Sequence, residues 1–427
     1  MTRLEVPYGT GALDCELPVA PHKLMPHYAE PHCSELELVA RALDTPLGKL
    51  PLAELGRGKK RAVILIACRT RRTGSHIYVP LVVERLVKAG IPYEEITVIT
   101  ATGTHDNFRP QDAELLLGKE LAGRVRFVGH DCDSPEKLEY VGTTSRGTEV
   151  FLNKTYLEAD LRIVTGRVTC HYFAGFSGGR KGILPGVSAR KTIRYNHSFA
   201  VIRNKGDVEL NPHTVNGLLD GNPIHEDMVE AAKFAMPDFC LNTVLDPAHR
   251  IVAAFGGDML EAHRAAVEIV REKDFISVDE PFDWLIVSSG GAPYDVNGIQ
   301  AIKAPINTFA GVRKGGALIL TAECPEGFPE WLLESTEIKS PEKLRAKIAA
   351  GQVVNGHNAL WLEKTRSHAA VILVSALKPD TIERLGFYPA KTLREAIKIA
   401  KDLTSAPQRI GIVPFGTTTV LESQSSK

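Results

Sequence analysis

Short runs of aliphatic and β-branched residues alternate with longer amphipathic stretches along most of the chain. Buried strands are predicted at 62–68, 96–103 and 161–168, with an amphipathic helix at 76–89. A polar segment rich in Asp, Glu and Pro follows at 277–282, and the same rhythm then resumes. The later predicted elements are strands at 284–289, 316–322, 369–375 and 409–413 and helices at 297–312 and 392–403. This alternation is typical of parallel α/β sheets.

A chain of 427 residues is longer than one ordinary hydrophobic core requires, so two domains are expected. We place the boundary in the polar segment, which gives a domain at 1–276 and a second at 277–427. The predicted fold is two α/β domains with mainly parallel sheets. Ligands of such sheets bind beyond the carboxyl ends of the strands. Four loops at predicted strand ends carry unusual residues, so we expect an active-site cleft between the two domains; the loops are 69–72, 102–105, 166–186 and 290–300.

The charge balance narrows the class of partner. Lys+Arg and Asp+Glu both number 51, so the chain lacks the basic excess expected of a dedicated nucleic-acid or membrane-surface binder. No apolar run reaches the ~20 residues of a membrane-spanning helix, and the polar start does not resemble a secretory signal. The seven cysteines form no CxxC pair, which predicts reduced thiols in a cytoplasmic protein, without a disulfide framework or zinc site.

The segment 171–197 contains the densest chemistry in the chain. Its turn Ser177-Gly178-Gly179 precedes Arg180 and Lys181, and glycines of this kind let backbone N–H groups approach an anion closely. A lysine there can bind phosphate, or form a covalent link once its amine is deprotonated. The alternative is a flexible surface loop with solvated Arg and Lys, but the aromatic residues in the segment (Phe173 and Phe176) favour a packed one. Neither a Walker A loop nor an opening GxGxxG motif is present.

Three histidines are candidates for chemistry. His105 ends the run Ala-Thr-Gly-Thr-His, and His171 follows Cys170; a histidine in either setting, taken alone, is more often a structural hydrogen-bonding residue than a catalyst. His197 lies on a predicted helix, where it is either a metal ligand or a surface residue. No HxxxH or HExxH pattern supports a zinc site.

Polar residues that suit carboxylate binding occur in both predicted domains. Arg71, flanked by Arg69 and Arg72, follows the first strand, where a guanidinium can bind a carboxylate or phosphate through two hydrogen bonds. Gln300 and Lys303 are three residues apart, so one helical turn would place them on the same face. A solvated basic turn and an ordinary helix start are the respective alternatives.

Taken together, these motifs resemble the lactate racemase family, whose members use a nickel-pincer nucleotide. The resemblance spans both predicted domains, and the run GGRKGxLPG between two histidines is its most specific part. The matching residues are VPYG at 6–9, Thr70-Arg71, Thr102 to His105, His171, the run 178–186, Asn196-His197, and 293–303 with Asp295, Asn297, Gln300 and Lys303.

The resemblance implies two α/β domains, with catalysis and cofactor attachment in the first and substrate contacts from the second. It implies a cofactor, the nickel complex of pyridinium-3-thioamide-5-thiocarboxylic acid mononucleotide, linked to Lys181 and bound through nickel to His197. Ser177, Gly178, Gly179 and Arg180 would complete the cofactor site. His105 and His171 would be the acid/base pair, and Arg71, Gln300 and Lys303, with Arg69, would bind the substrate. Cofactor-maturation enzymes are the implied partners.

The implied reaction inverts C2 of a 2-hydroxyacid by reversible hydride transfer through a flat 2-oxoacid. Each enantiomer then needs its own proton acceptor, and histidine suits this role because its pKa lies near 6.5. This racemase or epimerase chemistry is our principal hypothesis. The alternatives are an NAD-type 2-hydroxyacid dehydrogenase, which the absent GxGxxG disfavours, and a non-catalytic nucleotide- or ligand-binding homologue.

The chain departs from the family pattern near the substrate. Cys68 replaces an acidic residue, Arg69 adds charge, Arg72 stands where Pro is common, and Ile299 replaces a usual Tyr. The cofactor link, metal ligand and acid/base pair are retained. The sequence therefore predicts a substrate other than lactate, either malate, whose second carboxylate Arg69 would receive, or a larger 2-hydroxyacid.

Overall fold

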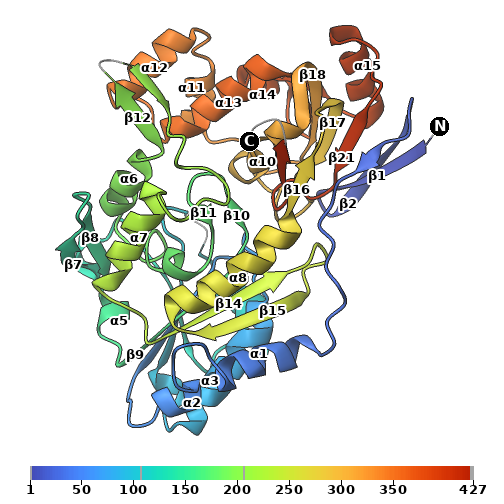
Figure 1. The fold of residues 1–427 in the computed structure, drawn as a ribbon. Helices are drawn as coiled ribbons and strands as arrows, with labels where there is room; N and C mark the ends of the chain where they lie inside the picture. Colours follow the sequence, from blue (N-terminus) through green and yellow to red (C-terminus); the bar gives the residue numbers. More distant parts are fainter. Residues whose placement is uncertain (1, 106–107, 205–206, 424–427) are drawn as a thin grey trace. The chain divides into compact units, whose positions relative to one another are not determined.

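The computed structural model describes residues 2–105, 108–204 and 207–423. Its contacts divide the chain into two compact units. The larger unit comprises 27–199 and 213–272, and the smaller unit comprises 1–26, 200–212 and 273–427. The sequence-based division at 277 therefore lies close to residue 273, where the chain passes from the larger unit back into the smaller one. The structure differs in that the smaller unit also takes two earlier segments of the chain (blue and green in Figure 1).

The larger unit is built on a six-stranded sheet of order β15-β14-β9-β4-β5-β6. All neighbouring strands pair in parallel except β14 and β15, which are antiparallel. The three strands predicted at 62–68, 96–103 and 161–168 are its adjacent central members. The bounds are β4 (Ala62–Ile66), β5 (Ile96–Thr100), β6 (Arg126–Gly129), β9 (Leu161–Arg167), β14 (Phe239–Leu245) and β15 (Ile251–Gly257).

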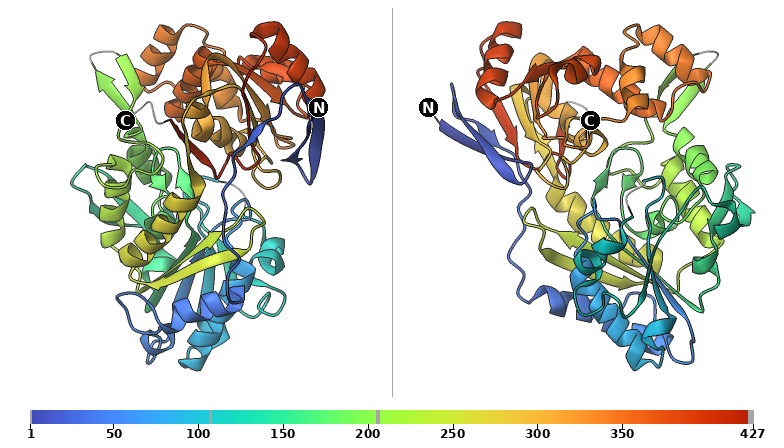
Figure 2. Two further views of the ribbon diagram at one scale, coloured as in Figure 1. Left: turned by 45° about the vertical axis from the view of Figure 1, so that its right-hand side comes forward. Right: turned by 180° about the vertical axis from the view of Figure 1, so that it is seen from behind.

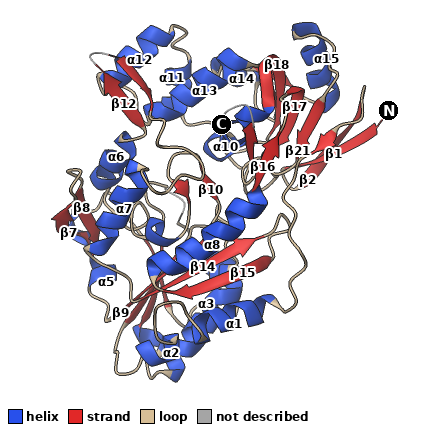
Figure 3. Cartoon of the chain, in the orientation of Figure 1, coloured by secondary structure: helices blue, strands red, loops and turns tan. Residues whose placement is uncertain are grey.

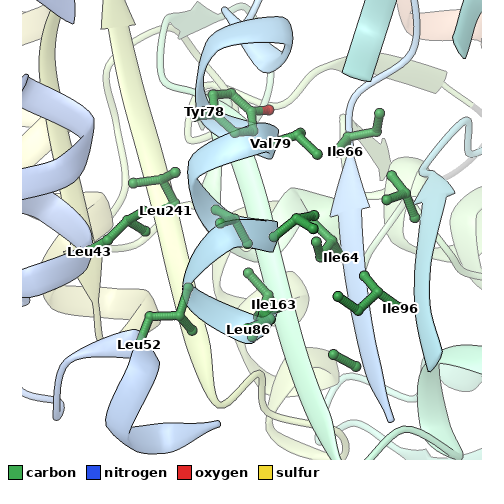
Figure 4. Packing of buried hydrophobic residues seen from close by; sticks show 14 of the residues in the cluster. Leu43, Leu52, Ile64, Ile66, Tyr78, Val79, Leu86, Ile96, Ile163 and Leu241 are labelled. Atoms are coloured by element: carbon green, nitrogen blue, oxygen red, sulfur yellow. The ribbon is translucent and has the colours of Figure 1, made fainter. Parts of the chain in front are cut away.

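Helices and short hairpins surround this sheet (Figure 3). Helix α3 covers β4 and β9 with Tyr78, Val79 and Leu86, which pack on Ile64 and Ile163 in the core shown in Figure 4. The helices are α1 (Glu35–Asp44), α2 (Leu52–Leu55), α3 (Ser75–Lys88), α4 (Ala113–Leu117), α5 (Lys154–Leu157), α6 (Arg190–Ser198), α7 (Pro223–Lys233) and α8 (Met259–Asp274). The hairpins are β7 (Leu138–Thr143) with β8 (Glu149–Asn153), and β10 (Cys170–His171) with β11 (Gly175–Phe176).

The smaller unit has its own six-stranded sheet, of order β20-β19-β18-β17-β21-β3, in which every neighbouring pair is parallel. The strands are β3 (His22–Lys23), β17 (Phe282–Ser288), β18 (Val312–Thr321), β19 (Ala370–Val374), β20 (Tyr388–Ala390) and β21 (Ile410–Val413). The helices are α9 (Gly298–Ala301), α10 (Lys303–Thr308), α11 (Glu330–Thr336), α12 (Pro341–Ala349), α13 (Gly356–His368), α14 (Pro379–Arg384) and α15 (Leu393–Leu403). A separate parallel pair joins β16 (Phe275–Val278) to β22 (Val420–Ser423).

Apolar burial explains why two early segments belong to the smaller unit. The hairpin of β1 (Thr2–Tyr8) and β2 (Gly11–Leu17) contributes Leu4, Val6 and Leu17 to the core formed with Trp284, and Figure 2 shows this blue hairpin beside the sheet. The hairpin of β12 (Val201–Asn204) and β13 (Asp207–Leu210) contributes Val208 to a cluster on α12 and α13. Such long-range packing leaves no trace in local periodicity.

The prediction of one continuous helix at 297–312 is wrong. The segment forms α9, α10 and the 3-10 turn η5 (Phe309–Gly311), with Ile302 as the cap shared by both helices. Pro305 has no N–H, so it cannot donate to the carbonyl of Ala301. That carbonyl accepts from Ser289 Oγ instead, at 3.5 Å. Gln300 and Lys303 nevertheless lie on one face, as predicted.

Two further properties concern the described residues alone. None of their helices combines the length and apolar character that crossing a membrane requires. The seven cysteines, all within the described ranges, form no disulfide bond.

The β1–β2 hairpin should be required for the stability of the smaller unit. Leu17 is 1% exposed, so Leu17→Ala should lower the free energy of unfolding by about 2–5 kcal/mol through lost burial and a residual cavity. Urea unfolding followed by tryptophan fluorescence measures this unit alone, because Trp284, Trp331 and Trp361 all lie in it. The exposed Leu403→Ala should change the same quantity by less than about 0.5 kcal/mol. Equal effects of the two substitutions would contradict the role of the β1–β2 hairpin in stabilising the smaller unit.

Candidate active site

The strand order of the larger unit brings three of the predicted loops to one edge of its sheet. Strands β9, β4 and β5 are parallel neighbours, so their carboxyl ends lie side by side. The loops that follow them contain 69–72, 102–105 and 168–186. The fourth predicted loop, 290–300, follows β17 in the sheet of the smaller unit.

The ring of Phe173 joins three of the predicted site residues. Its centroid lies 4.4 Å from that of His171 and 5.0 Å from that of His197, and both contacts are edge-on, with interplanar angles of 81° and 89°. Lys181 Nζ lies 5.4 Å from the Phe173 centroid and 3.0 Å from His171 Nε2. The structure thus brings an amine and two imidazoles around one buried ring, while all three polar side chains keep partial exposure.

Each of these side chains is placed by its own local structure. His171 ends β10, which pairs with β11, while Lys181 lies on the 3-10 turn η4 (Gly179–Gly182). His197 lies in the last turn of α6. The preceding residue, Asn196, is fully buried and donates to Asp227 Oδ2 at 2.8 Å, which holds this helix against α7. Of the two motif residues, Asn196 therefore anchors the helix, while His197 remains partly exposed.

Arg180, which the sequence analysis placed in the cofactor site, is buried within the loop. Only 1% of it is exposed. Its Nη2 donates to the carbonyls of Ala174 and Phe176, both at 2.9 Å. Burial lowers its pKa to about 9, and no described carboxylate forms an ion pair with it. We therefore assign Arg180 a positioning role: it fixes the carbonyls on the path from His171 to Lys181.

A second layer of buried groups supports Arg180. His263, from α8, places Nε2 2.8 Å from the Ser177 carbonyl and 2.9 Å from Arg180 Nη1. Burial, followed by the Arg180 charge, drives the pKa of His263 well below its ordinary value. The ring of His225 stacks at 6.4 Å from His263, and burial followed by the Arg180 charge lowers its pKa to about 3. Both imidazoles are therefore neutral beside the buried guanidinium.

The turn Ser177-Gly178-Gly179 also uses its polar groups within the protein. Ser177 Oγ donates to the Arg167 carbonyl at 2.8 Å, and Gly179 N donates to Asn242 Oδ1 at 2.9 Å. Gly178 has φ +76°, and a Cβ there would lie 2.7 Å from Val168 Cγ2. The glycines allow the turn to pack closely on β9 and β14, which is a structural use of the pattern predicted to cradle an anion.

The loop that carries His105 is attached to the end of the same glycine-rich run. Gly103 N donates to the Gly186 carbonyl at 3.0 Å, and His105 N donates to the Thr102 carbonyl at 3.0 Å. Thr102 Oγ1 in turn donates to the carbonyl of His130 at 2.9 Å. The side chain of His105 is exposed, at the same sheet edge as His171.

The predicted arginines follow β4 at this edge. Arg71 and Arg69 are both partly buried. Arg69 Nε lies 3.8 Å from Asp112 Oδ2, so a long ion pair offsets part of its charge. Cys68, which replaces the acidic residue of the family pattern, is buried with Sγ 3.2 Å from Thr70 Oγ1.

In the smaller unit, the predicted pair is in direct contact. Lys303 Nζ donates to Oε1 of the buried Gln300 at 2.7 Å. Close by in the chain, the fully buried Asp295 accepts from Gly9 N at 2.7 Å and from Glu323 N at 3.2 Å. Asp295 therefore connects the VPYG motif to the loop that carries Gln300.

The sequence interpretation missed the residues that shape the site from within. Phe173 was noted only as a packed aromatic residue, and nothing pointed to His263 or Asn242, which belong to distant elements. Asn222 had a local signal, since Asn before Pro is typical of a helix start. It caps α7, and its Nδ2 donates to the Phe173 carbonyl at 3.0 Å.

Comparisons with known proteins point to a single family. Residues 8–208 match the family model described as "Lactate racemase N-terminal domain", and residues 278–421 match "Lactate racemase C-terminal domain". Among curated relatives, a lactate racemase from Thermoanaerobacterium thermosaccharolyticum is 34% identical, with 99% of this chain and 100% of the relative covered. A lactate racemase from Lactiplantibacillus plantarum is 32% identical, with 97% and 99% covered.

Solved structures agree with this result. The structure of the lactate racemase apoprotein from Thermoanaerobacterium thermosaccharolyticum matches with a TM-score of 0.87 and 32% identity, covering 99% of this chain and 100% of that one. A Thermotoga maritima protein matches with a TM-score of 0.72 at 19% identity, covering 93% and 100%. At that identity the second match supports the fold alone.

The low pKa values of the buried His263 and the partly buried His225 predict an acid-sensitive larger unit. The pKa of histidine in an unfolded chain is ~6.5, and the pKa of His225 in the folded chain is about 3. Below pH ~6.5 the unfolded chain therefore binds the extra proton. The stability that the neutral ring provides is complete above that pH and is lost as pH falls toward 3. Hence His225→Gln should reduce the slope of unfolding free energy against pH, between pH 6 and 4, by up to ~1.4 kcal/mol per unit.

Urea unfolding followed by far-ultraviolet circular dichroism at several pH values measures this slope. The matched control is His76→Gln, since His76 is an exposed residue of the same unit. A slope that changes equally in both variants would refute the role assigned to burial.

Proposed function

Because this chain belongs to the lactate racemase family, we propose that it inverts C2 of a 2-hydroxyacid with a nickel-pincer nucleotide attached to Lys181. As a member it is an isomerase of the racemase type. The observation that carries the finer proposal is the convergence at Phe173, which is contacted by Lys181, His171 and His197. An anchoring amine, an acid/base group and a metal ligand would be needed together, and these side chains supply one of each.

The residues present fit the proposed cofactor. Lys181 offers a primary amine for covalent attachment, and His197 offers an imidazole for nickel. Among the described residues, no group of three or more His, Cys, Asp or Glu side chains is placed to hold a metal ion. A metal bound by His197 would be held jointly with the sulfur-containing cofactor proposed for this site. Arg180 forms no ion pair with a described carboxylate, so its charge also favours an anionic group near this loop.

When bound at Lys181 and His197, the cofactor would supply reversible hydride-transfer chemistry. The protein's own part is proton transfer, for which we assign His105 and His171. Each serves one enantiomer: it accepts the hydroxyl proton when that enantiomer is the substrate, and it returns a proton to the oxygen when that enantiomer is the product. Two histidines are needed because the two enantiomers present their hydroxyl groups in different directions. The 2-oxoacid formed from the substrate is planar at C2, so either face is open to reduction.

Substrate binding is assigned to Arg71, Gln300 and Lys303. A guanidinium can hold a carboxylate through two parallel hydrogen bonds. The ammonium group of Lys303 has three N–H donors, and the contact with Gln300 takes one of them. The buried Gln300 thereby fixes the direction of the lysine side chain, which gives the carboxylate or the neighbouring oxygen a defined partner.

The proposal predicts covalent loading at one residue. Protein produced together with cofactor-maturation enzymes and nickel should gain the mass of the nucleotide and racemise a 2-hydroxyacid, and Lys181→Ala should lose both. Intact mass spectrometry and polarimetry measure the two effects. His105→Ala and His171→Ala should each lower kcat by ~10²–10⁴ while retaining the folded state. A control, Lys401→Ala, alters an exposed lysine on α15 and should change neither measurement.

An unmodified mass under these conditions would favour a non-catalytic binding protein. Release of a 2-oxoacid with reduction of soluble NAD would instead indicate a dehydrogenase. Full activity of nickel-free protein made without the maturation enzymes would also refute the proposal.

The substrate is proposed to be malate or a 2-hydroxyacid larger than lactate. If Arg69 receives a second carboxylate, Arg69→Gln should lower kcat/KM for malate about tenfold, the value of one ~1.4 kcal/mol interaction, and leave that for lactate unchanged. The exposed Arg72→Gln is the control. A panel of D- and L-2-hydroxyacids assayed for loss of optical rotation provides the measurement. Preference for long apolar acids, with no effect of Arg69→Gln, would exclude the dicarboxylate and favour the larger substrate.

A further inference from the structure

The contact between Lys181 and His171 constrains which atoms of the two side chains carry protons. Lys181 Nζ is 3.0 Å from His171 Nε2. On the other side of the ring, His171 Nδ1 accepts from the backbone N–H of Ala174 at 3.4 Å. A neutral imidazole has one N–H and one lone pair. With the lone pair directed at the Ala174 N–H, the ring proton lies on Nε2.

This assignment determines the state of the lysine. An Nε2–H group can only donate, so Nζ must accept, and an ammonium group has no lone pair with which to do so. Lys181 is then a free amine. The reverse arrangement, an ammonium donating to Nε2, would place the ring proton on Nδ1, directly against the Ala174 N–H. The backbone contact therefore favours the neutral pair.

The surroundings hold the ring in this orientation. Ala174 is fully buried, and its carbonyl accepts from Arg180 Nη2 at 2.9 Å. Phe173 packs edge-on against His171 at 4.4 Å. A second cation at Lys181 would lie one residue from the buried guanidinium of Arg180, and like charges disfavour each other. The Phe173 face favours an ammonium only weakly, because Nζ at 5.4 Å is near the ~6 Å limit of a cation–π contact.

We infer that His171 has a second role, before any turnover: it keeps Lys181 as a free amine and so selects this lysine for acylation. The nature of the natural acyl group rests on the proposed function, while the reactivity of Lys181 does not. In the step itself, the Nζ lone pair forms an N–C bond to the acyl carbon as the bond from that carbon to its leaving group breaks. The leaving group takes the bonding electron pair and one amine hydrogen leaves as a proton, so no oxidant or reductant is needed.

Competitive labelling of the apoprotein tests this role. The protein is treated at pH 7 with a limiting amount of the N-hydroxysuccinimide ester of acetic acid, and peptide mass spectrometry compares Lys181 with the exposed Lys401. An ordinary lysine is a free amine in roughly one molecule in 10³ at this pH. Lys181 should therefore label at least about tenfold faster than Lys401, although its side chain is half-buried.

In the variant His171→Ala, the ratio of Lys181 to Lys401 labelling should fall at least about tenfold. The control His76→Ala removes an exposed histidine elsewhere in the same unit and should leave the ratio unchanged. Circular dichroism establishes that each variant is folded. If His171→Ala does not fold, the wild-type ratio alone decides the matter.

Equal labelling of Lys181 and Lys401 in the wild type would overturn the inference, as would an unchanged ratio in folded His171→Ala. The labelling uses no nucleotide, nickel or hydroxyacid. Its failure is therefore separate from a failure of racemase activity, and each can occur without the other.

Discussion

The candidate site depends on one buried cation. The guanidinium of Arg180 has almost no access to water, and its Nη2 donates to the carbonyl oxygens of Ala174 and Phe176 in its own loop, while its buried Nε has no hydrogen-bond partner among the described residues. Burying a charge in this way is costly unless its hydrogen bonds are made. These hydrogen bonds favour the loop conformation that directs both carbonyls at the guanidinium. Since His171 and Lys181 lie at the two ends of this stretch, their separation is set by Arg180.

The chain places its charges unevenly although they sum to zero. Arg69, Arg71, Arg180 and Lys181 all belong to loops at the carboxyl edge of one sheet. Neutral histidines such as His263 and His225 adjoin this charge without adding to it, because burial lowers their pKa values. An edge of this kind suits an anionic cofactor and a carboxylate substrate, which is the chemistry proposed for it.

Glycine in the run 178–186 serves packing as much as ligand binding. Gly178 and Gly179 bring the turn against Val168, Asn242 and His263, where a side chain would collide. Gly186 accepts from Gly103 and so ties the His105 loop to the same structure. The motif is specific because several distant elements require it at once, which explains how a short run can identify a family.

The sequence by itself determined the parallel α/β class, the central strands near 62–68, 96–103 and 161–168, and the helix that carries His197. Periodicity and strand ends are local properties, and they are read from neighbouring residues. The family motifs also singled out Lys181, and the structure adds that it meets His171 and His197 at Phe173. Those motifs did not reveal that Arg180 would be buried.

Only the tertiary structure decided the remaining features. The β1–β2 and β12–β13 hairpins join the smaller unit because Leu17 and Val208 find apolar partners there. His263 supports the lysine loop from a helix more than 80 residues away in the chain, since its contact with Ser177 spans 86 positions. Contacts of this range depend on the free energy of burying side chains from separate elements together. No local pattern records that free energy, so these features follow from the fold alone.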